Sequence, residues 1–117
     1  MIDFEIVKRQ IIKACKNLEI TNIEDMRTFT EFFRWYYQRY FELFGKEHKR
    51  LTVSSIEYAI YGMTRFDEIM GADDKVAVLQ ELAEQYFSCE FTQGTDYSIS
   101  HFAVPGILQN RIYEVLL

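Results

Sequence analysis

The sequence predicts an all-α fold in which residues 1–117 form a single helical domain, a small bundle of about five helices. Apolar residues recur with the helical period along most of the chain, and candidate N-cap residues precede most of these segments. A length of 117 residues suits one domain with one hydrophobic core. The pattern leaves one alternative open, an α+β fold with a short hairpin near residues 88–99.

The first amphipathic helix is predicted over residues 4–18, with Asp3 as its N-cap. Cys15 falls on the apolar side of this helix, where a free thiol behaves as a small hydrophobic side chain. Basic residues occupy the opposite side, so the helix has one face for the core and one for solvent.

The second helix is marked by a concentration of aromatic residues. Nine of the chain's nineteen aromatic residues (ten Phe, eight Tyr and one Trp) lie between Phe29 and Phe44. At about 100° per residue, eight of the nine share one half of a helix, and this stripe is expected to be core. Trp35 projects from the other, charged half.

Two starting points are open for this helix. Thr21 to Glu24 and Thr28 to Glu31 both match a capping box, so the segment is either one long helix from about residue 22 or a short turn followed by a helix. Gly45 is expected to end it, because glycine tolerates a left-handed backbone.

The second half of the chain contains further breaks and caps. Residues 45–53 are polar and irregular and are predicted to be a loop, and a capping box begins at Ser54. Gly71 is expected to end the third helix, and the residues around Gly94 are expected to separate two helices. Pro105 fits the first turn of a helix. The predicted elements are a third helix over 54–70, a fourth from Asp73 or Asp74 to Phe87, one turn over 98–103 and a last helix over 105–116.

Asp67 falls on the apolar side of the predicted third helix. A buried, unpaired carboxylate is costly. The sequence therefore predicts that Asp67 forms an ion pair with Arg111 or with a lysine of the first helix; the alternative is that it lines a groove.

The charge distribution disfavours nonspecific nucleic-acid binding but leaves one basic surface. The net charge is −5, whereas nonspecific binding depends on clustered cations that neutralise phosphates. The alternative function is therefore a nucleic-acid-associated accessory protein that uses the basic side of the first helix and the 46–50 loop. The residues that would contact phosphates are Lys8, Arg9, Lys13, Lys16, Lys46, Lys49 and Arg50.

The sequence contains no recognisable catalytic, metal or cofactor signature, and we predict that the chain is not an enzyme. His48 lies in a Lys/Arg-rich loop and is expected to be solvated. No Gly-x-Ser-x-Gly elbow accompanies His101 and its neighbouring serines, so His101 is expected to hydrogen-bond across to another helix. The five glycines are scattered and form no phosphate-binding loop.

A cytoplasmic location is predicted. No uninterrupted apolar run approaches the roughly 18 residues that a membrane span needs, and the acidic start of the sequence differs from a secretory signal. Cys15 and Cys89 are expected to remain reduced in that compartment.

Trp35 and Arg39 are the preferred candidates for contact with another protein. At i,i+4 spacing they can stack as a cation–π pair, and tryptophan and arginine are enriched at interface hot spots. Glu31 and Glu42 flank them on the charged half of the helix. Two alternatives remain: another segment of the same chain covers Trp35, or Trp35 mediates self-association. The acidic face of the third and fourth helices is the second choice of binding surface.

The C-terminal segment resembles short uncharacterised proteins of phages and conjugative elements of Gram-positive bacteria. Asp96 to Phe102 and Gly106 to Glu114 carry this resemblance. It implies a mobile-element protein that acts on a host protein or a defence system. It implies no catalytic residues.

Overall fold

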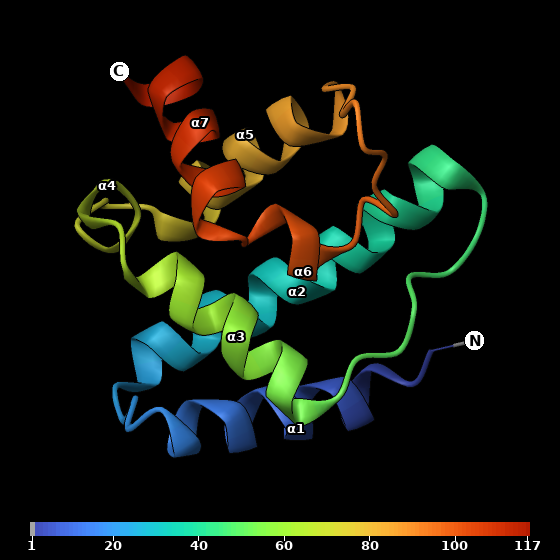
Figure 1. Ribbon diagram of the computed structural model, residues 1–117. Helices are drawn as coiled ribbons and strands as arrows, with labels where there is room; N and C mark the ends of the chain where they lie inside the picture. The colour runs from blue at the N-terminus through green and yellow to red at the C-terminus, as the bar shows by residue number, and fades with distance from the viewer. Residues whose placement is uncertain (1) are drawn as a thin grey trace.

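The computed structural model describes residues 2–117 and confirms the all-α prediction (Figure 1). The described residues contain no strand, and residues 88–98 form turns and irregular chain, so the prediction of a hairpin there is wrong. The helices are α1 (Phe4–Asn17), α2 (Ile23–Phe44), α3 (Val53–Thr64), α4 (Asp67–Met70), α5 (Lys75–Phe87), α6 (Ile99–Phe102) and α7 (Pro105–Leu116).

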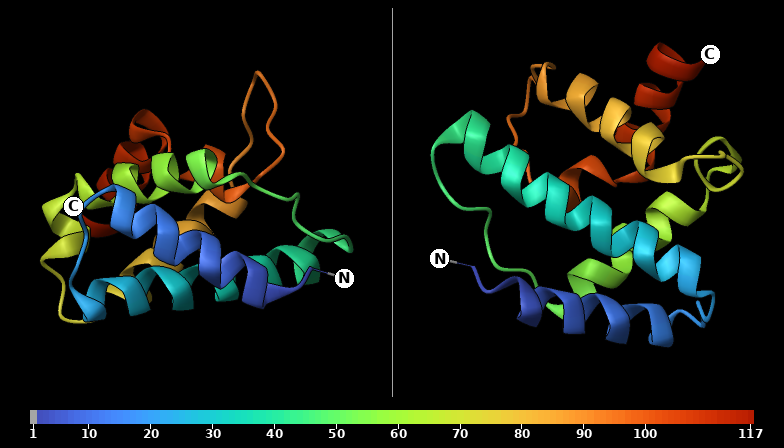
Figure 2. Two further views of the ribbon diagram at one scale, coloured as in Figure 1. Left: turned by 90° about the horizontal axis from the view of Figure 1, so that it is seen from below. Right: turned by 180° about the vertical axis from the view of Figure 1, so that it is seen from behind.

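The helices form two layers (Figure 2). In the first layer α2 lies between α1 and α5 and contacts both. The second layer contains α3, α6 and α7, with α3 packed on α1 and α7 packed on α5. The helix α2 thus lies in the middle of the first layer, and its aromatic side chains also reach Phe102 of α6 in the second layer.

The aromatic segment belongs to one continuous helix of 22 residues. The Asn22 side chain accepts hydrogen bonds from the backbone N–H groups of Glu24 and Asp25 and so caps the helix. Thr28 does not start a second helix, because its hydroxyl donates to the carbonyl of Glu24 within the same helix. Gly45 ends the helix in the left-handed conformation, with φ of 69°.

The aromatic stripe of α2 is buried over most, but not all, of its length. The buried members contact the other layer: Phe32 and Tyr36 both pack against Phe102 of α6. At the C-terminal end Phe41 is 54% exposed and Phe44 is 37% exposed, so the expectation that the whole stripe is core is wrong there. The buried members are Phe29, Phe32, Phe33, Tyr36, Tyr37 and Tyr40.

The predicted third helix ends earlier than the sequence suggests. The helix α3 begins after Thr52, whose hydroxyl caps it, and the chain leaves the helix at Arg65 before entering the four-residue α4. This break places Asp67 in the exposed first turn of α4. The predicted ion pair of Asp67 with Arg111 or with a lysine of the first helix is wrong: Asp67 is exposed and pairs with neither, and Arg111 pairs with Glu114.

The layers meet most closely where α3 passes α6. A Cβ atom added at Gly62 would lie 2.4 Å from the carbonyl oxygen of Ala103. No real Cβ tolerates that distance, and the obstacle is backbone rather than a flexible side chain. Glycine is therefore required at this point of the helix interface.

We predict that Gly62→Ala destabilises the protein by about 1–3 kcal/mol, because the methyl group forces α3 and α6 apart. Urea unfolding measures this change. Gly106→Ala is the matched control, since a Cβ there meets nothing within 4 Å. In α7 that substitution should be neutral or stabilising by up to about 1 kcal/mol. Equal effects of the two substitutions would contradict the close approach.

Candidate functional site

Arg39 forms an ion-pair bridge between α2 and α5. Its Nε and Nη2 donate to the two carboxylate oxygens of Glu84, at 2.6 and 3.2 Å, and Nη1 donates to Glu42 at 3.3 Å. Hydrogen bonding to Glu84 raises the pKa of Arg39. The guanidinium is thus engaged with two carboxylates rather than with the ring of Trp35.

Trp35 is half-buried by its own helix and the adjacent core. Its ring stacks on Phe32, with centroids 5.9 Å apart and an angle of 19° between the planes. Glu31 and Glu42 are exposed, but they lie apart: Glu42 joins the Arg39 ion pairs, while Glu31 lines an acidic hollow with residues 73–76 at the start of α5. Contact of these four residues with a partner stays a prediction.

The prediction that His48 is solvated is wrong. The side chain is 2% exposed, and its ring stacks on Tyr37 with centroids 4.4 Å apart. Its Nε2 atom lies 3.0 Å from the backbone nitrogen of Ile99, which can only donate, so Nε2 accepts. The proton must therefore sit on Nδ1, which donates to the carbonyl of Lys49 at 2.8 Å. His48 is a buried neutral imidazole, and burial lowers its pKa.

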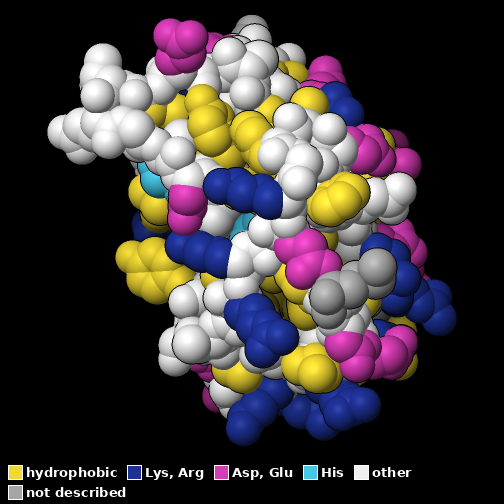
Figure 3. All heavy atoms as spheres, turned by 90° about the vertical axis from the view of Figure 1, so that its right-hand side faces the viewer, with side chains coloured by type: hydrophobic (Ala, Val, Ile, Leu, Met, Phe, Trp, Pro, Cys, Tyr) yellow, Lys and Arg dark blue, Asp and Glu magenta, His cyan; other side chains and the backbone are white. Residues whose placement is uncertain are grey.

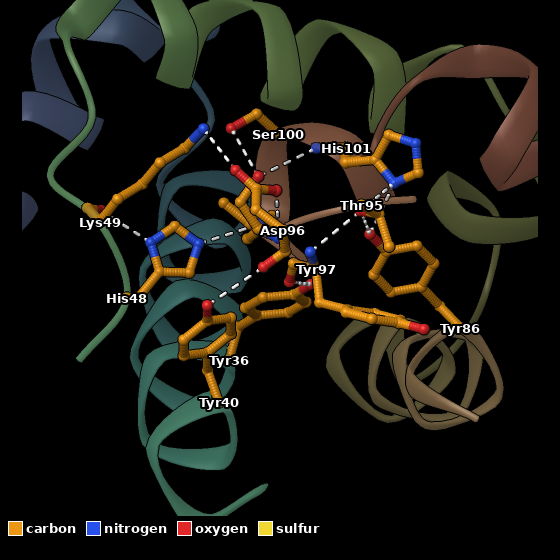
Figure 4. Close-up of polar contacts among 12 residues, drawn as sticks. Tyr36, Tyr40, His48, Lys49, Tyr86, Thr95, Asp96, Tyr97, Ser100 and His101 are labelled. Atoms are coloured by element: carbon orange, nitrogen blue, oxygen red, sulfur yellow. Dashed lines mark hydrogen bonds and ion pairs between the residues drawn. The ribbon is translucent and has the colours of Figure 1, made fainter. Parts of the chain in front are cut away.

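Other polar side chains hold the irregular segment before α6 on the same side of α2 (Figure 4). The hydroxyls of Tyr36 and Tyr40 donate to the carbonyls of Tyr97 and Asp96, at 2.7 and 3.1 Å. The Asp96 carboxylate is 2.7 Å from the ammonium of Lys49. Burial would raise the pKa of Asp96, but hydrogen bonds from Lys49 and the Ser98 backbone outweigh it and hold this pKa below its usual range. Residues 45–52 and 95–98 are thereby fixed to α2 and to each other.

The fixed 45–52 segment helps to form a groove with α1 and α2, which we call the α1–α2 groove. It has a volume of about 300 Å³ and mostly apolar walls. A second hollow of about 290 Å³ between α1 and residues 50–51 shares Ile2 and Tyr37 with it. Figure 3 shows the side of the molecule that bears the 45–52 segment, with exposed hydrophobic side chains between charged ones. The groove is lined by Ile2, Phe4, Arg34, Tyr37, Gln38, Phe41, Glu47 and His48.

The groove combines an aromatic wall with a cation. The guanidinium carbon of Arg34 lies 4.3 Å from the ring centroid of Phe4, within cation–π range. Glu47 accepts a hydrogen bond from the backbone N–H of Ile2 and ties the two edges together. This is the pairing of aromatic and arginine that the sequence suggested for Trp35 and Arg39. Sequence reasoning missed it because Phe4 and Arg34 lie on different helices.

The basic residues proposed for nucleic-acid contact are all exposed. One of them, Lys49, is paired with Asp96, and Figure 3 shows acidic side chains beside the lysines and arginines on this side of the molecule. The four on α1 are Lys8, Arg9, Lys13 and Lys16, and the three in the following loop are Lys46, Lys49 and Arg50.

His101 hydrogen-bonds to another helix, as predicted. Its Nδ1 atom is 2.7 Å from the hydroxyl of Tyr86 in α5 and 2.8 Å from the hydroxyl of Thr95 (Figure 4). The hydroxyl of Ser100 lies near that of Ser98 rather than near the imidazole. The arrangement ties α6 to α5.

The two cysteines are free thiols. Cys15 is buried, and burial, followed by the charge of Asp25, raises its pKa to about 11. A thiol with so high a pKa is a poor nucleophile at neutral pH. Within residues 2–117, no three His, Cys, Asp or Glu side chains converge as a metal ion would require.

Comparison with known proteins finds no family model, curated protein or solved structure that matches this chain. Over the described part of the chain, no helix is both long and apolar enough to cross a membrane.

We predict that stability falls on acidification below about pH 6.5, the ordinary pKa of histidine. In this range His48 becomes protonated in the unfolded chain but stays neutral in the folded chain, so protons favour unfolding. The contribution of His48 to the free energy of unfolding is complete above pH 6.5. It is lost as the pH falls from there through the lowered pKa that His48 has in the folded state. Urea unfolding across this pH range measures it.

His48→Phe keeps a ring against Tyr37 but leaves the N–H of Ile99 without an acceptor. It should lower the free energy of unfolding at neutral pH by about 1–3 kcal/mol. It should also remove the part of the fall in stability below pH 6.5 that comes from His48. Asp96→Asn is the control and should retain that dependence, because the Asp96 carboxylate titrates below its ordinary pKa of 3.8 and its charge raises, rather than lowers, the pKa of His48. An unchanged slope in His48→Phe would contradict a buried neutral imidazole.

Proposed function

We propose that this chain is a non-enzymatic helical module of the cytoplasm that binds another protein, and that the α1–α2 groove receives an apolar side chain of that partner. The observation that carries the proposal is the groove itself. It presents an apolar wall and an exposed Phe41 beside a cation, on a surface fixed by buried hydrogen bonds.

The physical argument starts from Phe41. A ring that is 54% exposed at the rim of an apolar groove gains free energy when a partner covers it, at about 25 cal/mol per Å² of apolar surface removed from water. Aromatic residues and arginine are enriched in interface cores. Because the 45–52 segment is already held by His48, little ordering of that segment opposes binding.

Charges at the rim indicate the kind of partner. Arg34 and Glu47 line the groove, and Arg50 and Asp3 line the adjoining hollow. Both carboxylates already accept backbone hydrogen bonds, Glu47 from Ile2 and Asp3 from Glu5. An apolar side chain followed by a carboxylate suits this combination, since arginine forms forked hydrogen bonds with carboxylates. The resemblance of the C-terminal segment to phage and conjugative-element proteins favours a bacterial host protein, including one of a defence system, as the partner.

The first test is capture of proteins from a Gram-positive host lysate by the tagged chain, with and without nuclease. We expect the partner to be retained in both samples. Its affinity is then measured with purified protein. Phe41→Ser and Arg34→Gln should each weaken binding by more than about 1 kcal/mol, a loss that only a minority of interface residues cause.

Tyr58→Ser is the matched control, because Tyr58 is an aromatic residue 67% exposed on α3, outside the groove lining. It should leave affinity unchanged. Trp35→Ala distinguishes the two surfaces of α2. If Trp35→Ala weakens binding while Phe41→Ser does not, the contact surface is the charged half of α2 and the groove proposal fails. Retention only without nuclease would instead favour the nucleic-acid-associated function.

A further inference from the structure

Arg111 of α7 is a buried cation whose hydrogen-bonding capacity is largely unused. The residue is 6% exposed, and its Nε and Nη1 atoms are buried without a hydrogen-bond partner. Its third nitrogen, Nη2, lies 3.6 Å from a carboxylate oxygen of Glu114, whose side chain is half exposed. Burial of a guanidinium with unpaired donors is costly. A hydrogen-bond acceptor beside Nε and Nη1 would remove this cost.

The polar side chains around Arg111 are already engaged with one another. The Tyr86 hydroxyl, the Thr95 hydroxyl and Nδ1 of His101 lie within hydrogen-bonding distance of one another, at 2.7, 2.8 and 3.1 Å (Figure 4). Burial raises the pKa of Tyr86, and the positive charge of Arg111 is close enough to oppose this rise. These three groups therefore border the guanidinium without satisfying its free donors.

Phe91 covers this cluster from the loop between α5 and α6. Its ring centroid is 5.8 Å from the guanidinium carbon of Arg111 and 5.2 Å from the ring centroid of His101. The later part of the loop is held down, because the carbonyls of Asp96 and Tyr97 accept hydrogen bonds from α2.

The tip of the same loop projects from the helices (Figures 1 and 2). Residues 92–94 at the tip are exposed. The carbonyl of Phe91 bonds within this tip, to the N–H of Gly94. Phe91 is held to the body of the protein by contacts of its ring with Tyr86, Tyr97 and His101, and the Cys89 carbonyl just before it accepts a hydrogen bond from the Tyr97 hydroxyl.

We propose that Arg111 is the centre of a binding site for the oxyanion group of a small molecule, a carboxylate or a phosphate, and that displacement of Phe91 opens it. The guanidinium has two edges that can hold an oxyanion, one formed by Nε and Nη2 and the other by Nη1 and Nη2. Each edge contains one donor without a partner, Nε or Nη1. An oxyanion can therefore bind in the bidentate manner at either edge. The anion would supply the missing acceptor, and apolar neighbours would strengthen the interaction by excluding water.

This site is separate from the α1–α2 groove, which shares no lining residue with it. A negative result for protein binding at the groove would not count against anion binding at Arg111, and the reverse also holds. The two also differ in ligand, because the groove is proposed for an apolar side chain of a protein and Arg111 for a small anion.

Thermal unfolding in chloride, acetate and phosphate, at constant pH and ionic strength, tests the site. Acetate or phosphate should raise the unfolding midpoint of the wild type by about 5 °C at ten times its dissociation constant. Arg111→Met, an apolar replacement of similar length, should lack this rise and should unfold no earlier than the wild type in chloride. A response to phosphate alone identifies a phosphate ligand, and a response to acetate alone identifies a carboxylate.

Arg27→Met is the matched control. Arg27 also forms an i,i+3 ion pair with a glutamate, Glu24 at 3.5 Å, but its side chain is exposed. The Arg27→Met variant should show the same rise of the unfolding midpoint in acetate or phosphate as the wild type, including any general stabilisation by phosphate. Equal anion responses in wild type and Arg111→Met would overturn the proposal.

A direct measurement covers the case in which Arg111→Met fails to fold. In the wild type, the side-chain Nε–H resonance of Arg111 should shift on titration with acetate or phosphate and exchange more slowly with water. An Arg111 resonance that does not respond to either anion would also overturn the proposal.

Discussion

The buried hydrogen bond between His48 and the backbone of Ile99 is the constraint on which the arrangement of the irregular segments depends. These residues lie 51 positions apart, and the imidazole accepts the Ile99 N–H in a site closed to water. A buried N–H without an acceptor would be costly, so the 45–52 segment is held against the start of α6. Tyr36 and Tyr40 add hydrogen bonds from α2 to the adjacent segment. Two segments without helical structure are thus fixed by side chains of the aromatic helix.

This constraint also accounts for the surface of the protein. Because His48 lies against Tyr37, the segment after α2 turns back toward α1 and forms one wall of the α1–α2 groove. The end of α2 extends past this point, which leaves Phe41 exposed at the rim. The same anchors hold residues 96–98 of the loop before α6, and Phe91, earlier in this loop, lies against Arg111 and His101.

Periodicity and capping chemistry were sufficient to predict α1, α5 and α7, because each depends on residues close together in the sequence, but they left open whether α2 begins near residue 22 or near residue 28. The break after α3 was not predictable, since Ile56 to Met70 keep an apolar pattern through it. His48 was misjudged because its neighbours in sequence are basic, whereas its neighbours in space are aromatic. Arg34 and Arg39 look alike on a helical wheel, and only the packing of α1 and α5 separates the arginine of the groove from the arginine paired with Glu84. Long-range contacts decided each of these cases.

The central claim is that His48 is a neutral imidazole with its proton on Nδ1 and its Nε2 accepting from Ile99. Long-range ¹H–¹⁵N correlation NMR of the histidine rings at neutral pH tests this most directly. We expect the Nε2 of His48 to resonate as an unprotonated, hydrogen-bonded nitrogen, and its Nδ1–H to exchange slowly with water. A His48 ring that interconverts between tautomers and titrates near pH 6.5, the ordinary value, would contradict the account.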